Sequence, residues 1–256
     1  MIPIADTTRS RSFPYVNVTI IALNFAVFFY ELALSNDAIR STIGGVPVTS
    51  ELDRFIWRWG NIPVCTLDTL GLRDTVSVSA ARLCAAQPHP AWTVFSAMFM
   101  HGGWLHILGN MLFLWIFGDN IEDAMGHVAY TLFYLVVGTA AAFTHMAFNA
   151  NDLTPAIGAS GAIAGVLGAY ILLFPRATVV TLVPLFIFMP VPIPAFLLIG
   201  FWFVMQLFSG FATFGTDAVG AGGGVAYFAH IGGFIAGVLL VNLFVGNRMR
   251  VRRQQY

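Results

Sequence analysis

The sequence predicts an all-α membrane protein: a bundle of six transmembrane helices with a long, structured loop after the first helix. The first observation behind this prediction is composition, because 58% of the 256 residues are hydrophobic and only 9% are charged. Soluble domains have about 25% charged residues, so this chain cannot cover itself with a water-facing surface. The second is segmentation into apolar runs close to the ~20 residues that cross a bilayer. The net charge is zero, so nothing points to nucleic acid as a partner.

The apolar runs divide the chain into an N-terminal tail at 1–15, a six-helix domain at 16–245 and a basic C-terminal tail at 246–256. The long first loop occupies residues 35–91. Prolines at alternate positions before the fifth span, which is short, predict that Leu182–Ile193 is extended or interfacial. The expected spans are Val16–Leu34, Trp104–Ile121, Val128–Phe148, Ala156–Phe174, Ala195–Phe208 and Val225–Val245.

Arginine placement predicts the orientation of the bundle. With six spans both termini lie on one side, and most arginines fall on that side, close to helix ends. These are Arg9, Arg11, Arg176, Arg248, Arg250, Arg252 and Arg253. The other arginines lie in the long first loop, mixed with acidic residues. The positive-inside rule therefore places both termini in the cytoplasm. The first span lacks a small-residue cleavage site and is expected to be a retained helix rather than a signal peptide.

A serine and a histidine stand near the starts of two apolar spans. Ser160 lies in the tetrapeptide Gly158-Ala159-Ser160-Gly161, and His230 follows Ala229 in the sixth span. Each is expected four or five residues into its span, so both sit at one depth on the outer side. An intramembrane ionisable group indicates a functional site, and an imidazole beside a hydroxyl can make it a nucleophile. The alternative is that Ser160 only bonds a backbone carbonyl between packed helices.

Small residues favour a close approach of these two spans. Gly161 and Gly165 follow the serine with a spacing of four, and Gly233 and Gly237 follow the histidine with the same spacing. Such pairs let membrane helices pack with their backbones close together. The matched depth and the matched glycines favour a serine–histidine dyad.

A second polar pair lies in the second span. His106 and Asn110 are four residues apart and share one helix face, near the depth of the dyad. An amide and an imidazole there can stabilise an oxyanion. The alternatives are hydrogen bonds between helices, or a metal site built from His101, His106 and His230. No carboxylate or thiol is expected at a matching depth to complete a ligand set, so the sequence predicts no metal and no cofactor.

Three motifs in this order resemble those of the rhomboid family of intramembrane serine proteases. They are His101-x4-His106-x3-Asn110, Gly158-Ala159-Ser160-Gly161 and Ala229-His230-x2-Gly233-x3-Gly237. The resemblance covers residues 92–245 and fits the bacterial six-helix form. It implies Ser160 as nucleophile, His230 as general base, and an oxyanion site formed by Asn110, His106 and the Ser160 amide. It also implies transmembrane substrates, cleaved near the outer face of a bacterial inner membrane.

Two positions depart from the family pattern. Trp92 is followed by Thr93, where many members have arginine, so any role of that arginine is lost. Position 164, four residues after the serine, is alanine; some members have a tyrosine there that stacks on the histidine. Another side chain is therefore expected to hold the ring of His230. Two other function classes compete with a protease: a catalytically silent rhomboid-like binding protein and, with less support, a transporter.

The connecting segments carry further expectations. Ser50 is predicted to cap a short helix that ends at Gly60 and lies in the outer interface, the alternative being an insertion packed on itself. Cys65 and Cys84 in the same loop are equally compatible with a disulfide and with two free thiols. The glycine-rich segment 215–224 is placed to cover the site. The bulky side chains proposed to close a substrate gate between the fifth and second spans are Phe201, Trp202 and Met205 against Phe113 or Trp115.

Overall fold

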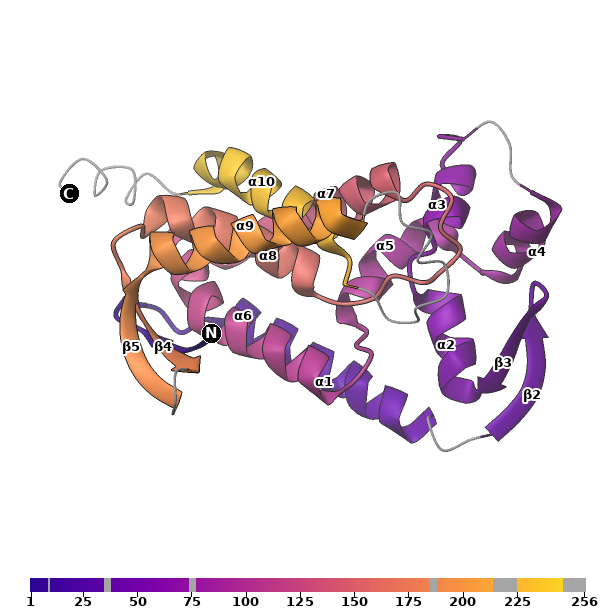
Figure 1. Cartoon of the computed structure of the whole chain (residues 1–256), viewed down its shortest axis with the longest axis horizontal. Coiled ribbons are helices and arrows are strands. Elements are labelled where there is room, and N and C mark those ends of the chain that lie inside the picture. Colours follow the sequence, from indigo (N-terminus) through magenta and orange to yellow (C-terminus); the bar gives the residue numbers. More distant parts are fainter. Residues whose placement is uncertain (9, 35–37, 74–76, 185–187, 214–224, 246–256) are drawn as a thin grey trace.

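The computed structural model describes the chain except residues 9, 35–37, 74–76, 185–187, 214–224 and 246–256 (Figure 1). It is predominantly helical, as predicted. Two short 3₁₀ turns, Pro90–Trp92 and Ala97–Phe99, flank α5. The helices are α1 (Tyr15–Leu34), α2 (Glu51–Trp59), α3 (Pro63–Thr69), α4 (Val78–Ala86), α5 (Thr93–Ser96), α6 (Trp104–Met125), α7 (His127–Phe148), α8 (Ser160–Leu173), α9 (Ala195–Thr213) and α10 (Tyr227–Phe244).

Helices occur at all six positions where spans are expected. Within the described residues, α1, α7, α9 and α10 are long and apolar enough to cross a membrane, whereas α8 has only 14 residues. The number of six spans therefore stays a prediction. The fifth span was expected to be short, and this expectation is wrong, because α9 runs for 19 residues to Thr213. Gly210, near its end, is buried close to Tyr227 and Ile231 of α10.

The bundle is helical as predicted, and strands lie outside it, in the N-terminal segment and in the loops. The proline-rich segment is extended, as predicted: β4 (Thr178–Pro184) pairs antiparallel with β5 (Phe188–Pro194). The segment expected to be an N-terminal tail contains β1 (Ile2–Asp6), which adds to the free edge of β4 and gives the order β1-β4-β5.

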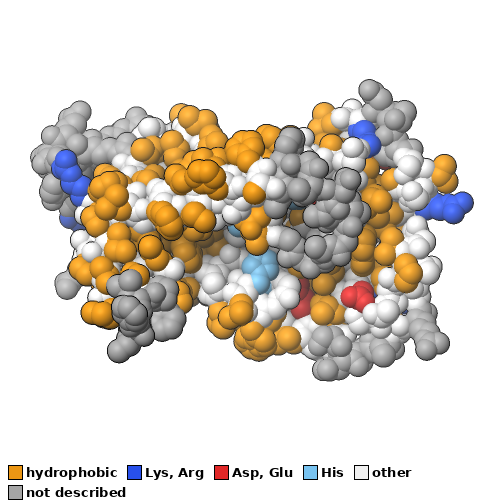
Figure 2. Space-filling view, viewed as in Figure 1, with side chains coloured by type: hydrophobic (Ala, Val, Ile, Leu, Met, Phe, Trp, Pro, Cys, Tyr) orange, Lys and Arg blue, Asp and Glu red, His pale blue; other side chains and the backbone are white. Residues whose placement is uncertain are grey.

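The strands lie at opposite ends of the molecule. In Figure 1 the sheet β1-β4-β5 and the last turn of α10 lie at the left end, and the first loop lies at the right end. The N-terminal strand and the end of α10 thus share one end, as an even number of spans requires. Figure 2 shows hydrophobic side chains spread over this face, with the visible basic side chains toward its two ends.

The first loop has its own small core. Ser50 caps α2 in a reciprocal capping box with Asp53, and the helix ends before Gly60, as predicted. A second hairpin, β2 (Ala38–Ile43) with β3 (Val46–Ser50), precedes α2. Cys65 and Cys84 are joined by a disulfide inside a cluster against which Trp57 packs. This packing supports the alternative of an insertion folded on itself, and the interfacial placement of α2 stays a prediction.

Helix α8 occupies the centre of the bundle. Every residue from Gly161 to Tyr170 is buried, and α8 packs against α6, α7, α9 and α10. The glycine seam is present as predicted: a Cβ added to Gly233 would lie 2.0 Å from the Gly161 carbonyl oxygen. One added to Gly237 would lie 2.0 Å from the carbonyl oxygen of Gly165. Because α8 and α10 touch through their backbones, their first turns are held side by side.

Candidate active site

Ser160 is the first residue of α8, not four residues into it as the sequence suggested. Gly158, two residues before the helix, has φ +129°, a backbone conformation that residues other than glycine rarely adopt. Its N–H donates to the Ala97 carbonyl at 2.8 Å. The serine therefore sits where the first N–H groups of a helix lack intrahelical partners and the helix dipole favours negative charge.

The first loop shapes the segment that leads to Ser160. Asn61 forms an isolated antiparallel bridge with Ala156, with N–H to carbonyl distances of 3.0 and 2.8 Å. The guanidinium of Arg73 donates to the Ala150 carbonyl and to the Asn151 side chain at 2.5 and 2.6 Å. These long-range contacts hold residues 150–156 outside the helix, which explains why α8 begins later than its apolar run.

The predicted contact between the serine and the histidine is present. Ser160 Oγ lies 2.7 Å from Nε2 of His230, which is on the first turn of α10 and only 8% exposed. This distance is that of a hydrogen bond between a hydroxyl and an imidazole nitrogen. The two side chains meet because the glycine seam brings the starts of α8 and α10 together.

His106 lies on the other side of Ser160. A Cβ on Gly158 would stand 2.7 Å from His106 Nε2 and 3.7 Å from Ser160 Oγ, so the imidazole and the hydroxyl flank the same glycine. The Gly102 N–H donates to Nδ1 of His106 at 3.4 Å. In a neutral ring Nδ1 then carries no proton and Nε2 does, so an N–H donor is available beside the serine.

Asn110 is one turn further along α6, on the face of His106. Its side chain is 8% exposed, and its Nδ2 has no hydrogen-bond partner among the described residues. Buried amide donors are normally paired, whereas this side chain has a donor without a described partner, one helical turn from His106.

Two further polar side chains, which were not predicted from the sequence, contact histidines of this region. Gln206 of α9 presents Oε1 at 2.8 Å from Nδ1 of His230. Glu31 of α1 is 2% exposed and accepts from the backbone N–H of His101, at 3.3 and 3.2 Å to its two oxygens. Both stand out in the sequence as polar residues within apolar spans, although nothing in the sequence identifies their partners.

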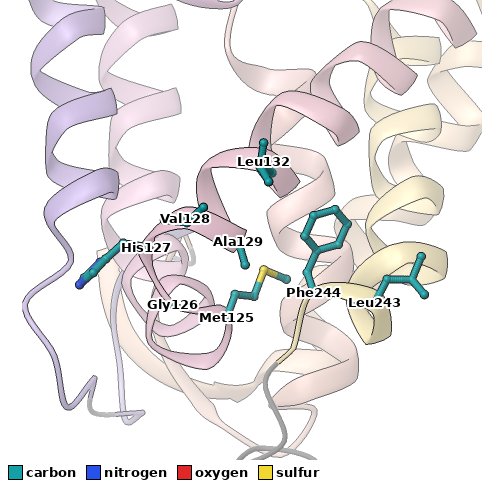
Figure 3. Close-up of a pocket in the computed structure, with 8 residues that line it drawn as sticks. All are labelled: Met125, Gly126, His127, Val128, Ala129, Leu132, Leu243 and Phe244. Carbon is teal, nitrogen blue, oxygen red and sulfur yellow. The ribbon is translucent and has the colours of Figure 1, made fainter.

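Four of the five proposed gate residues line one small cavity. Phe113, Phe201, Trp202 and Met205 surround a space of about 150 Å³ between α6, α8 and α9, whereas Trp115 is largely exposed. The ring of Trp202 also lies 5.8 Å from that of His230. The glycine-rich segment expected to cover the site, 215–224, lies outside the described residues. A larger groove of about 530 Å³, where Met125 faces Phe244, lies away from the dyad at the other end of α10 (Figure 3).

The fold and this site together define a helical membrane protein with a hydroxyl–imidazole pair at the end of its bundle opposite β1. A family model described as the rhomboid domain matches residues 88–247, more than half of the chain. The chain belongs to the rhomboid family.

Relatives with rhomboid names come from plants, yeast and bacteria. RHOMBOID-like protein 1 of Arabidopsis thaliana is 30% identical over 169 residues, covering 61% of this chain and 39% of that protein. Rhomboid protein 1, mitochondrial, of Saccharomyces cerevisiae is 30% identical over 172 residues, covering 64% and 44%. Rhomboid protease GluP of Bacillus subtilis is 35% identical over 78 residues, covering 30% and 15%. The chain thus spans about half or less of the length of these relatives.

Proposed function

We propose that this protein is an intramembrane serine endopeptidase that cleaves transmembrane segments of other membrane proteins near the outer face of the bilayer. The observation that carries the proposal is the 2.7 Å contact between Ser160 Oγ and His230 Nε2. A paired hydroxyl and imidazole, with further donors beside them, are the parts that acyl transfer needs.

The reaction begins when Nε2 of His230 takes the Ser160 hydroxyl proton as the oxygen attacks the scissile carbonyl carbon. The tetrahedral oxyanion accepts hydrogen bonds from the Asn110 amide, His106 Nε2–H and the Ser160 backbone N–H. The imidazolium of His230 then donates its proton to the leaving amine as the peptide C–N bond breaks. Water, deprotonated by His230, attacks the acyl ester, and the carboxylate product leaves as the proton returns to Ser160.

The proposal includes the orientation of the protein in the membrane. We place both termini in the cytoplasm and the first loop outside, in a bacterial inner membrane. The arginine distribution supports this orientation, and so does the disulfide between Cys65 and Cys84, since disulfides persist in oxidising compartments. Lipid and transmembrane substrates are then the partners, and the dyad needs no metal. A membrane-impermeant thiol reagent added to intact cells should label the two cysteines only after reduction; labelling only in inverted vesicles would reverse the orientation.

The dyad is tested by an active-site probe and by cleavage. A fluorophosphonate should label the purified protein at Ser160, and Ser160→Ala and His230→Ala should each reduce cleavage of a model transmembrane substrate by about 10⁴-fold or more. The double variant should lose little more, because the two groups act as a unit. Wild-type cleavage by either folded single variant would refute the mechanism. A wild-type protein that binds the substrate without labelling or cleavage would instead be the silent binding factor.

A further inference from the structure

The imidazole of His230 has a second polar neighbour besides Ser160. Gln206 lies on the second half of α9, and its Oε1 is 2.8 Å from His230 Nδ1. An amide oxygen can only accept, so Nδ1 carries the proton and donates it to Gln206. The neutral ring then has no proton on Nε2, which is the nitrogen beside Ser160 Oγ.

We infer that Gln206 is the positioning residue that fixes the tautomer and orientation of His230 for proton abstraction from Ser160. This inference rests on the proposed function. A general base needs an unprotonated nitrogen facing the nucleophile, and the bond made by the other ring nitrogen decides which one that is. Gln206 supplies that bond without a third acidic residue.

Two other features of the site fit this role. Position 164 is alanine, so no aromatic ring from α8 covers the imidazole. Besides Ser160, the side chains of Trp202 and Gln206 contact the imidazole, and both come from α9. Trp202 lies one turn before Gln206, and its ring is 5.8 Å from that of His230 at an interplanar angle of 33°. Helix α9 therefore restrains the histidine by ring contact and by a hydrogen bond, while α10 carries it and α8 carries the nucleophile.

The test uses two substitutions at position 206 in the full-length protein in detergent. Gln206→Met keeps the length of the side chain and removes the amide, whereas Gln206→Glu keeps an acceptor oxygen. Val204→Met is the matched control, because Val204 lies on the same helix and is exposed. Each is measured by fluorophosphonate labelling rate, by kcat and KM on a model substrate against pH, and by thermal unfolding.

Gln206→Met should lower both the labelling rate and kcat by about 10-fold to 100-fold with little change in KM, since only the base is disturbed. Gln206→Glu should retain most of the labelling rate and move the acidic limb of the kcat profile to higher pH, because a carboxylate stabilises the imidazolium. Val204→Met should behave as the wild type. If Gln206→Met folds poorly, Gln206→Glu carries the test alone through its pH profile.

The inference is overturned if Gln206→Met labels at the wild-type rate, or if Gln206→Glu shows an unshifted acidic limb. Nitrogen NMR of labelled His230 gives a direct reading: the wild type should show the Nδ1–H tautomer, and an Nε2–H tautomer would contradict the inference. A wild-type protein that does not label at Ser160 refutes the proposed function itself. If labelling of Ser160 requires His230 but is unchanged by substitutions of Gln206, only the role of Gln206 is refuted.

Discussion

Polar side chains are buried at both ends of the bundle, but the hydrogen bonding of these side chains differs. At the end that carries β1, which is the inner end in the proposed topology, Glu122 of α6 accepts from the N–H groups of Val16 and Asn17 at 3.0 and 2.7 Å and lies 2.5 Å from His127 Nδ1. The Asn17 side chain in turn donates to the Leu114 carbonyl and accepts from the Tyr130 hydroxyl. At the opposite end, which is the outer end in the proposed topology, Asn110 Nδ2 has no partner among the described residues.

This difference distinguishes polar groups that stabilise the fold from polar groups that act in the proposed reaction. Polar groups taken out of water favour folding only when they are paired, so the closed network around Glu122 joins α1 to α6 and α7. An unpaired donor costs stability, and in the proposed reaction Asn110 Nδ2 gains a partner, the oxyanion. Changes at the outer end should therefore affect turnover, and changes at the inner end should affect folding.

The sharpest test of the comparison at the outer end is Asn110→Ala. Removing one oxyanion donor should lower kcat by about 10²- to 10³-fold, or about 2.7–4 kcal/mol of transition-state stabilisation, with KM nearly unchanged. Because Nδ2 is unpaired in the resting protein, thermal stability should be unchanged or slightly higher. Cleavage kinetics and thermal unfolding of the same preparation measure both. A variant that loses stability in proportion to its activity would show that Asn110 stabilises the fold rather than the oxyanion.

Glu122→Ala is the matched change at the inner end. It leaves two backbone N–H groups at the start of α1 without their acceptor, so the free energy of unfolding should fall by about 2–4 kcal/mol. The fluorophosphonate labelling rate of the fraction that remains folded should match that of the wild type. Glu122→Gln, which keeps one acceptor oxygen, should lose less stability. A variant that is stable but slow to label would show that the inner network also tunes the dyad.

The contrast also shows which parts of the fold can be predicted from sequence. The contact between Ser160 and His230 follows from two spans predicted to run in the same direction and from glycines that let them touch, all of which are local patterns. The start of α8 at Ser160 does not follow, because the bridge from Asn61 to Ala156 links segments far apart in the chain. The partner of Gln206 is hidden for a related reason: an almost wholly apolar helix such as α9 has no strong polar face to define its rotation.

The N-terminal strand provides a second example. Nothing in residues 1–15 alone predicts a strand, since β1 pairs with β4, a segment more than 170 residues further along the chain. The first loop was more predictable, because its capping serine and acids act within one turn of α2. Elements set by signals within one turn of the chain can therefore be predicted from the sequence, whereas backbone that a distant segment determines cannot.

The smallest expected effect concerns Asp6, the one carboxylate of β1. Its oxygen accepts from the Tyr170 hydroxyl and, at 3.1 Å, from Asn120 Nδ2, which also bonds the Asp119 carboxylate. Burial raises the pKa of Asp6 above its ordinary value of 3.8, although hydrogen bonds from Tyr170 and Thr8 oppose the rise. The folded protein thus binds this proton more tightly than the unfolded chain.

Docking of β1 should therefore be strongest below pH 3.8, weaken as the pH rises from there through the raised pKa of Asp6, and stay constant above it. Hydrogen-exchange protection factors of the β1 amides, measured across this range, should fall slightly in the wild type. They should remain level in Asp6→Asn, which cannot ionise. The hairpin β2–β3 at the outer end serves as internal reference within each sample. An equal slope in Asp6→Asn would assign the pH dependence to another group, and a rise in protection with pH would mean that the ionised carboxylate is the form that holds the strand in place.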